Sequence, residues 1–216
     1  MLRTLYMIRH GESEWNACHK IQGQLDSHLS ASGRRQARAL FCRLRNETFD
    51  AVYASDLSRA ADTALIATGR EPSAIHLTPA LREVSFGDWE GLTIDEVKRR
   101  YPEALQAFRQ DPVNCRPATG ESFDDLSSRI VGLLDYWHEN HHGQGVAAFT
   151  HGGPVRAALI HLLGMPPGNW RTLRVANTGL TRVDFGEGGP RLHYFDTTGH
   201  LCVARPGRAG GEDEVS

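Results

Sequence analysis

Two histidines in this sequence stand where an imidazole could act as a nucleophile. His10 and His151 each follow a short apolar run, and each is followed by glycine. A neutral imidazole is available near neutral pH, and glycine lets the backbone come close to a ligand. Arg9, beside His10, would supply the positive charge that attack on a phosphate dianion requires. The tripeptide Arg9-His10-Gly11 alone would also suit a structural histidine that is hydrogen-bonded at a strand end. The choice between the two interpretations therefore depends on other residues.

Those other groups follow further predicted strands. Arg59 stands near the start of a predicted helix after the strand at 49–54, and Glu83 follows the short strand at 75–77. The long loop after His10 carries three more candidates for ligand contact: Asn16, Gln22 and Gly23. Strand ends would thus bring arginine, histidine and one carboxylate together. This set suits phosphoryl transfer, because cations hold the phosphoryl oxygens, one group attacks and one acid–base group moves the proton.

The hydrophobic pattern predicts the elements that position these groups. Strands are expected at 2–8, 49–54, 75–77 and 146–149, and a hairpin at 181–185 and 191–195. Helices are expected at 33–45, 58–68, 93–100, 121–139 and 154–163. Strands that alternate with helices predict an α/β fold, a three-layer sandwich with a mostly parallel central sheet flanked by helices. Ligands of such sheets bind beyond the carboxyl ends of the strands, where both histidines are expected.

A single domain is predicted over residues 1–205. The stretch 84–120 contains aromatic residues, prolines and only short helical pieces, so we expect it to cover one edge of the sheet as a cap-like excursion. The residues 206–216 are Gly-rich and charged, which is typical of a disordered tail.

Composition narrows the classes of partner. The formal net charge is −2, so neither nucleic acid nor an anionic membrane is an expected partner. No apolar run approaches the roughly 20 residues needed to span a bilayer. The four cysteines show no CxxC spacing, which disfavours a disulfide scaffold and a zinc cluster. A cytoplasmic location with free thiols is therefore expected.

Several runs of the sequence resemble the motifs of a known family. The runs 5–12 and 22–26, with Asn16 between them, look like the signature of the histidine phosphatase superfamily, also called the phosphoglycerate mutase-like family. The family's later motifs are matched in the same order by four further runs: 55–60, 81–83, 120–122 and 150–153. The resemblance covers about residues 3–200, and it implies a phosphoglycerate mutase-like fold.

The resemblance also implies a role for each matched residue. His10 would take the phosphoryl group, and Glu83 would protonate the leaving oxygen and then activate water. Two arginines and the second histidine would hold the phosphoryl oxygens: Arg9, Arg59 and His151. Four further residues would contact the substrate: Asn16, Gln22, Gly23 and Gly152. The family needs no metal or other cofactor, and the sequence has no carboxylate cluster suited to Mg²⁺.

Three functions are compatible with this resemblance: a phosphatase of small phosphorylated metabolites, a cofactor-dependent phosphoglycerate mutase, and an idle binding protein. An idle protein would have lost a core residue, and none is missing. In the mutase branch a longer basic insertion follows the Glu83 motif, whereas the run 86–93 here resembles the phosphatase branch. We therefore predict a metal-independent histidine acid phosphatase, a phosphomonoester hydrolase for which broad specificity is one option. The physiological substrate and a homodimer stay open.

Several charged residues outside these motifs keep two interpretations. Asp88 and Glu90 could supply a second acid, but a structural turn is the favoured interpretation. Arg109 and Arg116 could contact a distal anionic group of the substrate, or they could be ordinary surface arginines.

Overall fold

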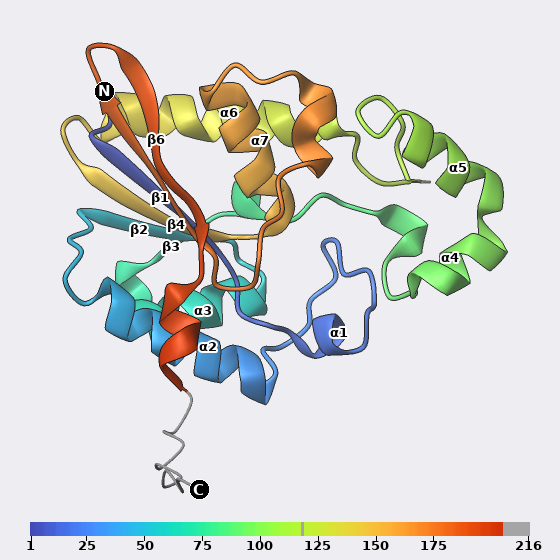
Figure 1. Ribbon diagram of the computed structural model, residues 1–216, viewed down its shortest axis with the longest axis horizontal. Coiled ribbons are helices and arrows are strands. Elements are labelled where there is room, and N and C mark those ends of the chain that lie inside the picture. The colour runs from blue at the N-terminus through green and yellow to red at the C-terminus, as the bar shows by residue number, and fades with distance from the viewer. Residues whose placement is uncertain (118, 205–216) are drawn as a thin grey trace, which may run out of the picture.

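A six-stranded mixed sheet forms the centre of the molecule (Figure 1). The computed structural model describes residues 1–117 and 119–204, so the tail predicted at 206–216 lies outside the described residues. The strand order is β3-β2-β4-β1-β5-β6. The strands are β1 Thr4–Arg9, β2 Ala51–Ala54, β3 His76–Leu77, β4 Gly145–Thr150, β5 Leu180–Gly186 and β6 Gly189–Thr197. The first four run parallel, and β5 and β6 form a hairpin antiparallel to β1.

The described ranges contain seven α-helices, four of which cover the faces of this sheet. They are α1 Glu14–Ala17, α2 Ala31–Leu44, α3 Ser58–Thr68, α4 Ile94–Arg100, α5 Pro102–Gln110, α6 Phe123–Asn140 and α7 Gly152–Leu162. The pair α2 and α3 packs on one face of the sheet and the pair α6 and α7 on the other, as Figure 1 shows. No helix in the described part of the chain is long and apolar enough to cross a membrane.

The central strands are apolar on both faces because both faces are covered by helices. In β1, Leu5 and Met7 belong to the core under α6 and α7, while Tyr6 and Ile8 belong to the core over α2 and α3. This alternation follows from the strand geometry, in which successive side chains point to opposite faces. The result is a rigid sheet whose parallel strands end at a common edge.

After Glu83 the chain leaves the sheet and forms a separate lobe that carries α4 and α5 (Figure 1). Thr93 caps α4 and forms a capping box with Glu96, which satisfies backbone donors at the start of the helix. Trp89 and Phe108 of the lobe are both buried and pack edge to face with ring centroids 5.5 Å apart, and both belong to the same apolar core cluster as the buried side chains of α6. The lobe therefore has a fixed apolar attachment to the main body.

The predicted α/β sandwich with a mostly parallel sheet is confirmed, and its elements differ in detail. The strand expected at 75–77 is only the two-residue β3, whose side chains are exposed at the sheet edge. The prediction did not include α1 and α5. The first is a single turn inside the long loop, and the second begins at Pro102, because the fixed φ of proline suits the first position of a helix.

Candidate active site

His10 lies at the carboxyl end of β1, where its backbone N–H donates to Thr150 O at 2.9 Å and ties β1 to β4. The side chain is 2% exposed. Its Nδ1 lies 2.6 Å from Gly11 O, and because a carbonyl can only accept, Nδ1 carries the proton. Nε2 is therefore left with a free lone pair. Burial, then the charges of Arg9 and Arg59, hold the pKa of His10 well below its usual range.

His151 follows β4, and its ring centroid is 5.0 Å from that of His10. The ring is fully buried and contacts two polar groups. Arg59 Nε donates to Nδ1 at 3.3 Å, so the proton of the neutral ring lies on Nε2, which donates to Ser55 Oγ at 3.0 Å. Burial, followed by the charges of Arg59 and of His10, holds the pKa of His151 well below its usual range. Both imidazoles are thus neutral at neutral pH.

Arg59 comes from the first turn of α3, and only 1% of it is exposed. Its Nη1 donates to Leu25 O at 2.9 Å and its Nη2 to Gly23 O at 2.7 Å, so the loop fixes the guanidinium in place. Burial lowers the pKa of Arg59 to about 10, which leaves it charged at neutral pH. The loop itself needs glycine, because Gly23 has φ +53° and a Cβ there would collide with the Glu90 carboxylate.

Arg9 is the second cation next to His10. Its Nη1 donates to Val175 O at 2.6 Å, whereas its buried Nε has no hydrogen-bond partner among the described residues. A buried N–H without an acceptor costs free energy unless a ligand accepts from it. Burial lowers the pKa of Arg9, and the negative charge of Glu83 opposes that shift. Arg9 therefore offers a donor beside the nucleophile candidate.

Glu83 supplies the carboxylate, and it lies at the N-terminus of α7. Gly153 N donates to its Oε1 at 2.9 Å, and Val84 N donates to the same oxygen at 2.9 Å. The backbone of Glu83 is also held, because Arg129 Nη2 donates to its carbonyl oxygen at 2.9 Å. Arg129 in turn pairs with Glu121 at 3.0 Å. The carboxylate is thus fixed at a helix N-terminus, and its negative charge raises the pKa of both site arginines against the effect of burial.

The remaining predicted contact residues lie around the same edge, and their side chains are bonded within the protein. Asn16 Oδ1 accepts from Ser13 N at 3.1 Å, and Gln22 Oε1 accepts from Ser13 Oγ at 2.7 Å. Gly152 is the first residue of α7, and a Cβ on it would lie 3.7 Å from Glu83 Oε2. The structure therefore brings all nine predicted residues to one end of the sheet, but it engages Asn16 and Gln22 in local loop contacts.

Several residues that support this arrangement were not identified from the sequence as site residues. Ser55 orients His151, and Asn177 Nδ2 donates to His10 O at 3.0 Å. The Glu90 carboxylate accepts from the backbone of Gln24 and Phe86. Ser55 and Glu90 stand inside runs that the family resemblance covers. Asn177 lies in a loop without a periodic pattern, where no sequence signal marks it.

No group of three or more His, Cys, Asp or Glu side chains in the described ranges is arranged to hold a metal ion. The site is instead built from two neutral imidazoles, one buried and one half-buried guanidinium and one carboxylate around the end of the parallel strands. Such a set can hold a tetrahedral dianion, attack it with nitrogen and move one proton.

Comparisons with known proteins agree with this arrangement. The model of the histidine phosphatase superfamily (branch 1) matches residues 5–198. Phosphoserine phosphatase 1 from Hydrogenobacter thermophilus is 34% identical over 197 residues, which cover 91% of this chain and 93% of that protein. A probable phosphoglycerate mutase from Yersinia pestis is 37% identical over 187 residues, 85% of each chain.

A solved structure of a phosphoserine phosphatase from Entamoeba histolytica in complex with phosphoserine superposes with a TM-score of 0.82. It is 32% identical and covers 92% of this chain and 98% of its own. The match over nearly the whole chain, in sequence and in fold, leads to one conclusion. This chain belongs to the histidine phosphatase superfamily, branch 1.

Proposed function

We propose that this protein is a phosphatase that hydrolyses phosphomonoesters of small metabolites through a phosphohistidine at His10. The observation that carries the proposal is the state of the His10 ring. Its Nδ1 is engaged with Gly11 O, so the lone pair lies on Nε2. The low pKa of His10, which burial and two arginines cause, keeps that nitrogen unprotonated at neutral pH. A buried, neutral and oriented imidazole beside fixed cations is a competent nucleophile for phosphorus.

In the first step His10 Nε2 forms a bond to phosphorus while the bond from phosphorus to the ester oxygen breaks. Arg9 and Arg59 hold the phosphoryl oxygens as charge shifts onto them, and His151 joins them by turning its Nε2–H from Ser55 Oγ to a phosphoryl oxygen. The leaving alkoxide takes a proton from the Glu83 carboxyl group and departs as an alcohol. The products of this step are the alcohol, the phosphorylated ring and the Glu83 carboxylate.

In the second step a water molecule attacks the phosphorus atom and gives a proton to the Glu83 carboxylate. The bond between phosphorus and Nε2 breaks, inorganic phosphate forms, and His10 returns to its neutral state. Glu83 ends protonated, ready for the next cycle. Since Gly153 N and Val84 N both donate to Oε1, Oε2 is the oxygen with the weaker backbone contact, and we assign the proton transfers to it.

The test is a phosphate-release assay on small phosphomonoesters with wild type and His10→Ala. Wild type is expected to release phosphate and to carry acid-labile phosphate when it is quenched during turnover. His10→Ala is expected to lose both signals. His28→Ala, which changes an exposed histidine, serves as the control. Turnover and labile phosphate that persist in His10→Ala would refute the assignment.

A phosphoglycerate mutase is the second candidate, because a relative with that name matches 85% of the chain. A mutase must keep water away from the phosphohistidine until the substrate has turned. Phosphorus NMR of a reaction with 3-phosphoglycerate separates the two functions. A phosphatase gives inorganic phosphate, and a mutase gives 2-phosphoglycerate.

We also propose that the lobe within residues 84–120 acts as a cap over the substrate, in a single domain that spans 1–205. A cytoplasmic location is proposed as well, and the four unpaired cysteines fit a reducing compartment. A homodimer stays a prediction that light scattering of the purified protein can check.

A further inference from the structure

Arginines that the proposed reaction does not use continue outward from Arg9 along one side of the site. Arg156 lies on α7, and its Nη1 is 3.5 Å from the point that a Cβ on Gly152 would occupy. Glu83 Oε2 is 3.7 Å from the same point. Arg156 therefore reaches the end of the site where phosphoryl transfer is proposed. With Arg9 and Arg174 it also lines a cavity of about 530 Å³.

Trp170 lies between Arg156 and a further arginine, Arg171, and contacts both. It is 7% exposed and lies in the short 3-10 helix Pro167–Arg171. The guanidinium of Arg156 is 5.7 Å from the centroid of its ring, and that of Arg171 is 5.5 Å away. Two cations thus share one indole, although like charges repel.

Both guanidiniums have fixed positions. Arg156 Nε donates to Leu173 O at 2.7 Å. Arg171 stands 4.8 Å from the centroid of the Phe108 ring, on the lobe. Arg156 and Arg171 therefore form a row of cations that bridges the main body and the lobe. Apart from a contact of 3.5 Å from Arg171 to Phe108 O, their remaining N–H groups have no protein acceptor on the described residues.

The charge of this row is not balanced locally. Arg109, Arg156, Arg171 and Arg174 form no ion pair with any described carboxylate. Burial, together with the positive charges of Arg109 and Arg156, lowers the pKa of Arg171. The one acid of the cavity, Asp196, lies at the Arg9 end, where its Oδ1 accepts from Ala176 N at 2.8 Å.

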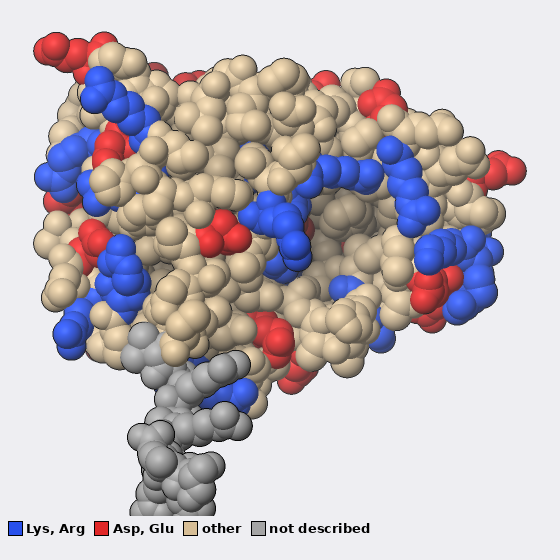
Figure 2. All heavy atoms as spheres, in the orientation of Figure 1, with Lys and Arg blue, Asp and Glu red and all other residues tan. Residues whose placement is uncertain are grey.

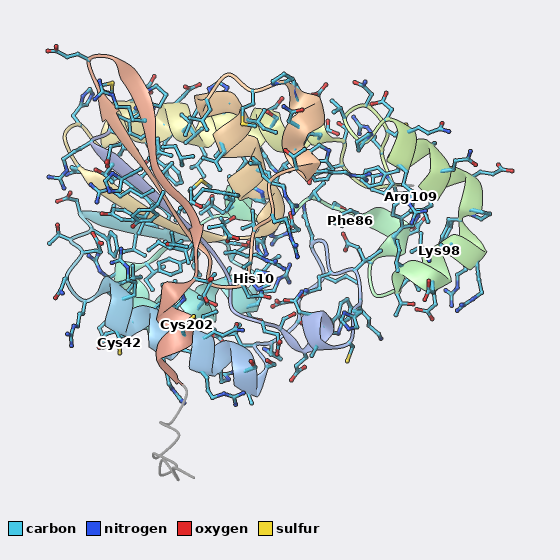
Figure 3. All side chains as sticks on the ribbon, viewed as in Figure 1. His10, Cys42, Phe86, Lys98, Arg109 and Cys202 are labelled. Atoms are coloured by element: carbon cyan, nitrogen blue, oxygen red, sulfur yellow. The ribbon has the colours of Figure 1, made fainter. Side chains whose placement is uncertain are left out.

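The row borders an open space. Figure 2 shows a hollow between the main body and the lobe, with basic side chains along its rim. Figure 3 shows His10 on the body side of this space and Arg109 on α5, on the lobe side. A substrate whose phosphoryl group lies against His10 would extend its other end toward the row.

We propose that Arg156 and Arg171, with Arg109 at the outer end, bind a second anionic group of the substrate. The enzyme would then select phosphomonoesters that also carry a carboxylate or a second phosphate over neutral ones. The planar guanidinium fork fits either group in a bidentate contact. This inference rests on the proposed function, and it adds the substrate class to it.

The test compares kcat/KM within matched pairs of substrates. 3-Phosphoglycerate and glycerol 3-phosphate differ in the carboxylate, while fructose 1,6-bisphosphate and fructose 6-phosphate differ in the second phosphate. Wild type is expected to prefer the more anionic member of at least one pair by about tenfold, the worth of one charge-assisted contact. The pair that shows the preference identifies the anionic group.

Arg171→Gln and Arg156→Gln are each expected to lower that preference about fivefold to tenfold. Arg171→Lys keeps the charge and should retain part of the preference. Arg99→Gln changes an exposed arginine of α4 and should retain all of it. A purely structural role of the arginines would lower kcat/KM for both members of a pair equally and leave the ratio unchanged.

The outcomes separate the two proposals. A wild type that turns over both members of each pair with equal kcat/KM, or variants that keep the wild-type ratio, would overturn the selectivity proposal alone. A wild type that forms no acid-labile phosphate with any of these substrates would overturn the proposed function itself.

Discussion

Glu90 joins the two segments that hold the site arginine and the site carboxylate, so its removal should damage catalysis without touching a substrate contact. Its Oε1 accepts from Gln24 N at 3.0 Å and from Phe86 N at 2.9 Å, and its Oε2 accepts from Leu25 N at 3.1 Å. The segment 23–25 supplies the carbonyl oxygens that fix Arg59. Glu90 is thus a positioning residue for Arg59.

The expected effect of Glu90→Ala follows from these contacts. Three backbone N–H groups lose a charged acceptor, and each such bond contributes about 1.5–3 kcal/mol. Water can replace part of this, because the segment is only half-buried, so we expect the free energy of unfolding to fall by about 2–4 kcal/mol. Removing one donor to the reacting oxygens outright costs about 100-fold in kcat. Loosening Arg59 should therefore cost about tenfold.

The assay measures kcat, KM and the inhibition constants of vanadate and phosphate for Glu90→Ala and for Asp88→Ala. Asp88 is exposed, and within residues 1–117 and 119–204 its carboxylate accepts only from Thr119 Oγ1 at 3.3 Å, so its variant is the matched control. A loose Arg59 should weaken binding of vanadate, which imitates the transition state, more than binding of phosphate. The reasoning is refuted if Glu90→Ala has wild-type stability and a kcat within twofold of wild type.

The remaining predictions concern the acid Glu83, the buried His10 and the absence of a metal requirement. Glu83→Gln should slow turnover of alkyl phosphates most and of p-nitrophenyl phosphate least, since p-nitrophenolate leaves without protonation; equal losses in steady-state assays would argue against Glu83 as the acid. Because the folded-state pKa of His10 lies below its unfolded value, the unfolded chain binds an extra proton below about pH 6.5. The stability that neutral His10 contributes is complete above that pH and is lost as the pH falls, by about 1.4 kcal/mol per pH unit. The free energy of unfolding, measured with urea between pH 5 and 6.5, should therefore change less steeply with pH in His10→Gln than in wild type, by this amount per pH unit. An unchanged pH dependence would contradict the assignment. EDTA should leave activity unchanged, and inhibition that a divalent ion reverses would favour a metal mechanism.

The fold was predictable because its central strands carry a strong signal. The runs that became β1 and β4 are apolar on both faces, and each ends at a histidine followed by glycine. Parallel strands end at the same edge, so the meeting of His10 and His151 followed from the pattern. The motif order then identified the family.

The parts that could not be predicted depend on contacts between distant segments. The residues next to Glu90 in the sequence do not indicate whether its carboxylate faces solvent or accepts from the backbone of residues 24 and 25. That contact is set by how the distant loop folds. The same holds for Trp170, whose two arginine neighbours come from different elements. Asn16 and Gln22 were predicted as substrate contacts, and that role stays a prediction while their side chains bond to Ser13.

The position of β1 in the sheet has a consequence for the biosynthesis of the enzyme. The first strand to be made pairs only with β4 and β5, which are translated last among the inner strands. A nascent chain that stops before residue 145 has an apolar strand with both edges unpaired, the kind of segment that invites association with other chains. Premature termination would therefore yield an aggregation-prone fragment without activity. His10 would be joined by the residues of the site only after β4 and β5 have been synthesised.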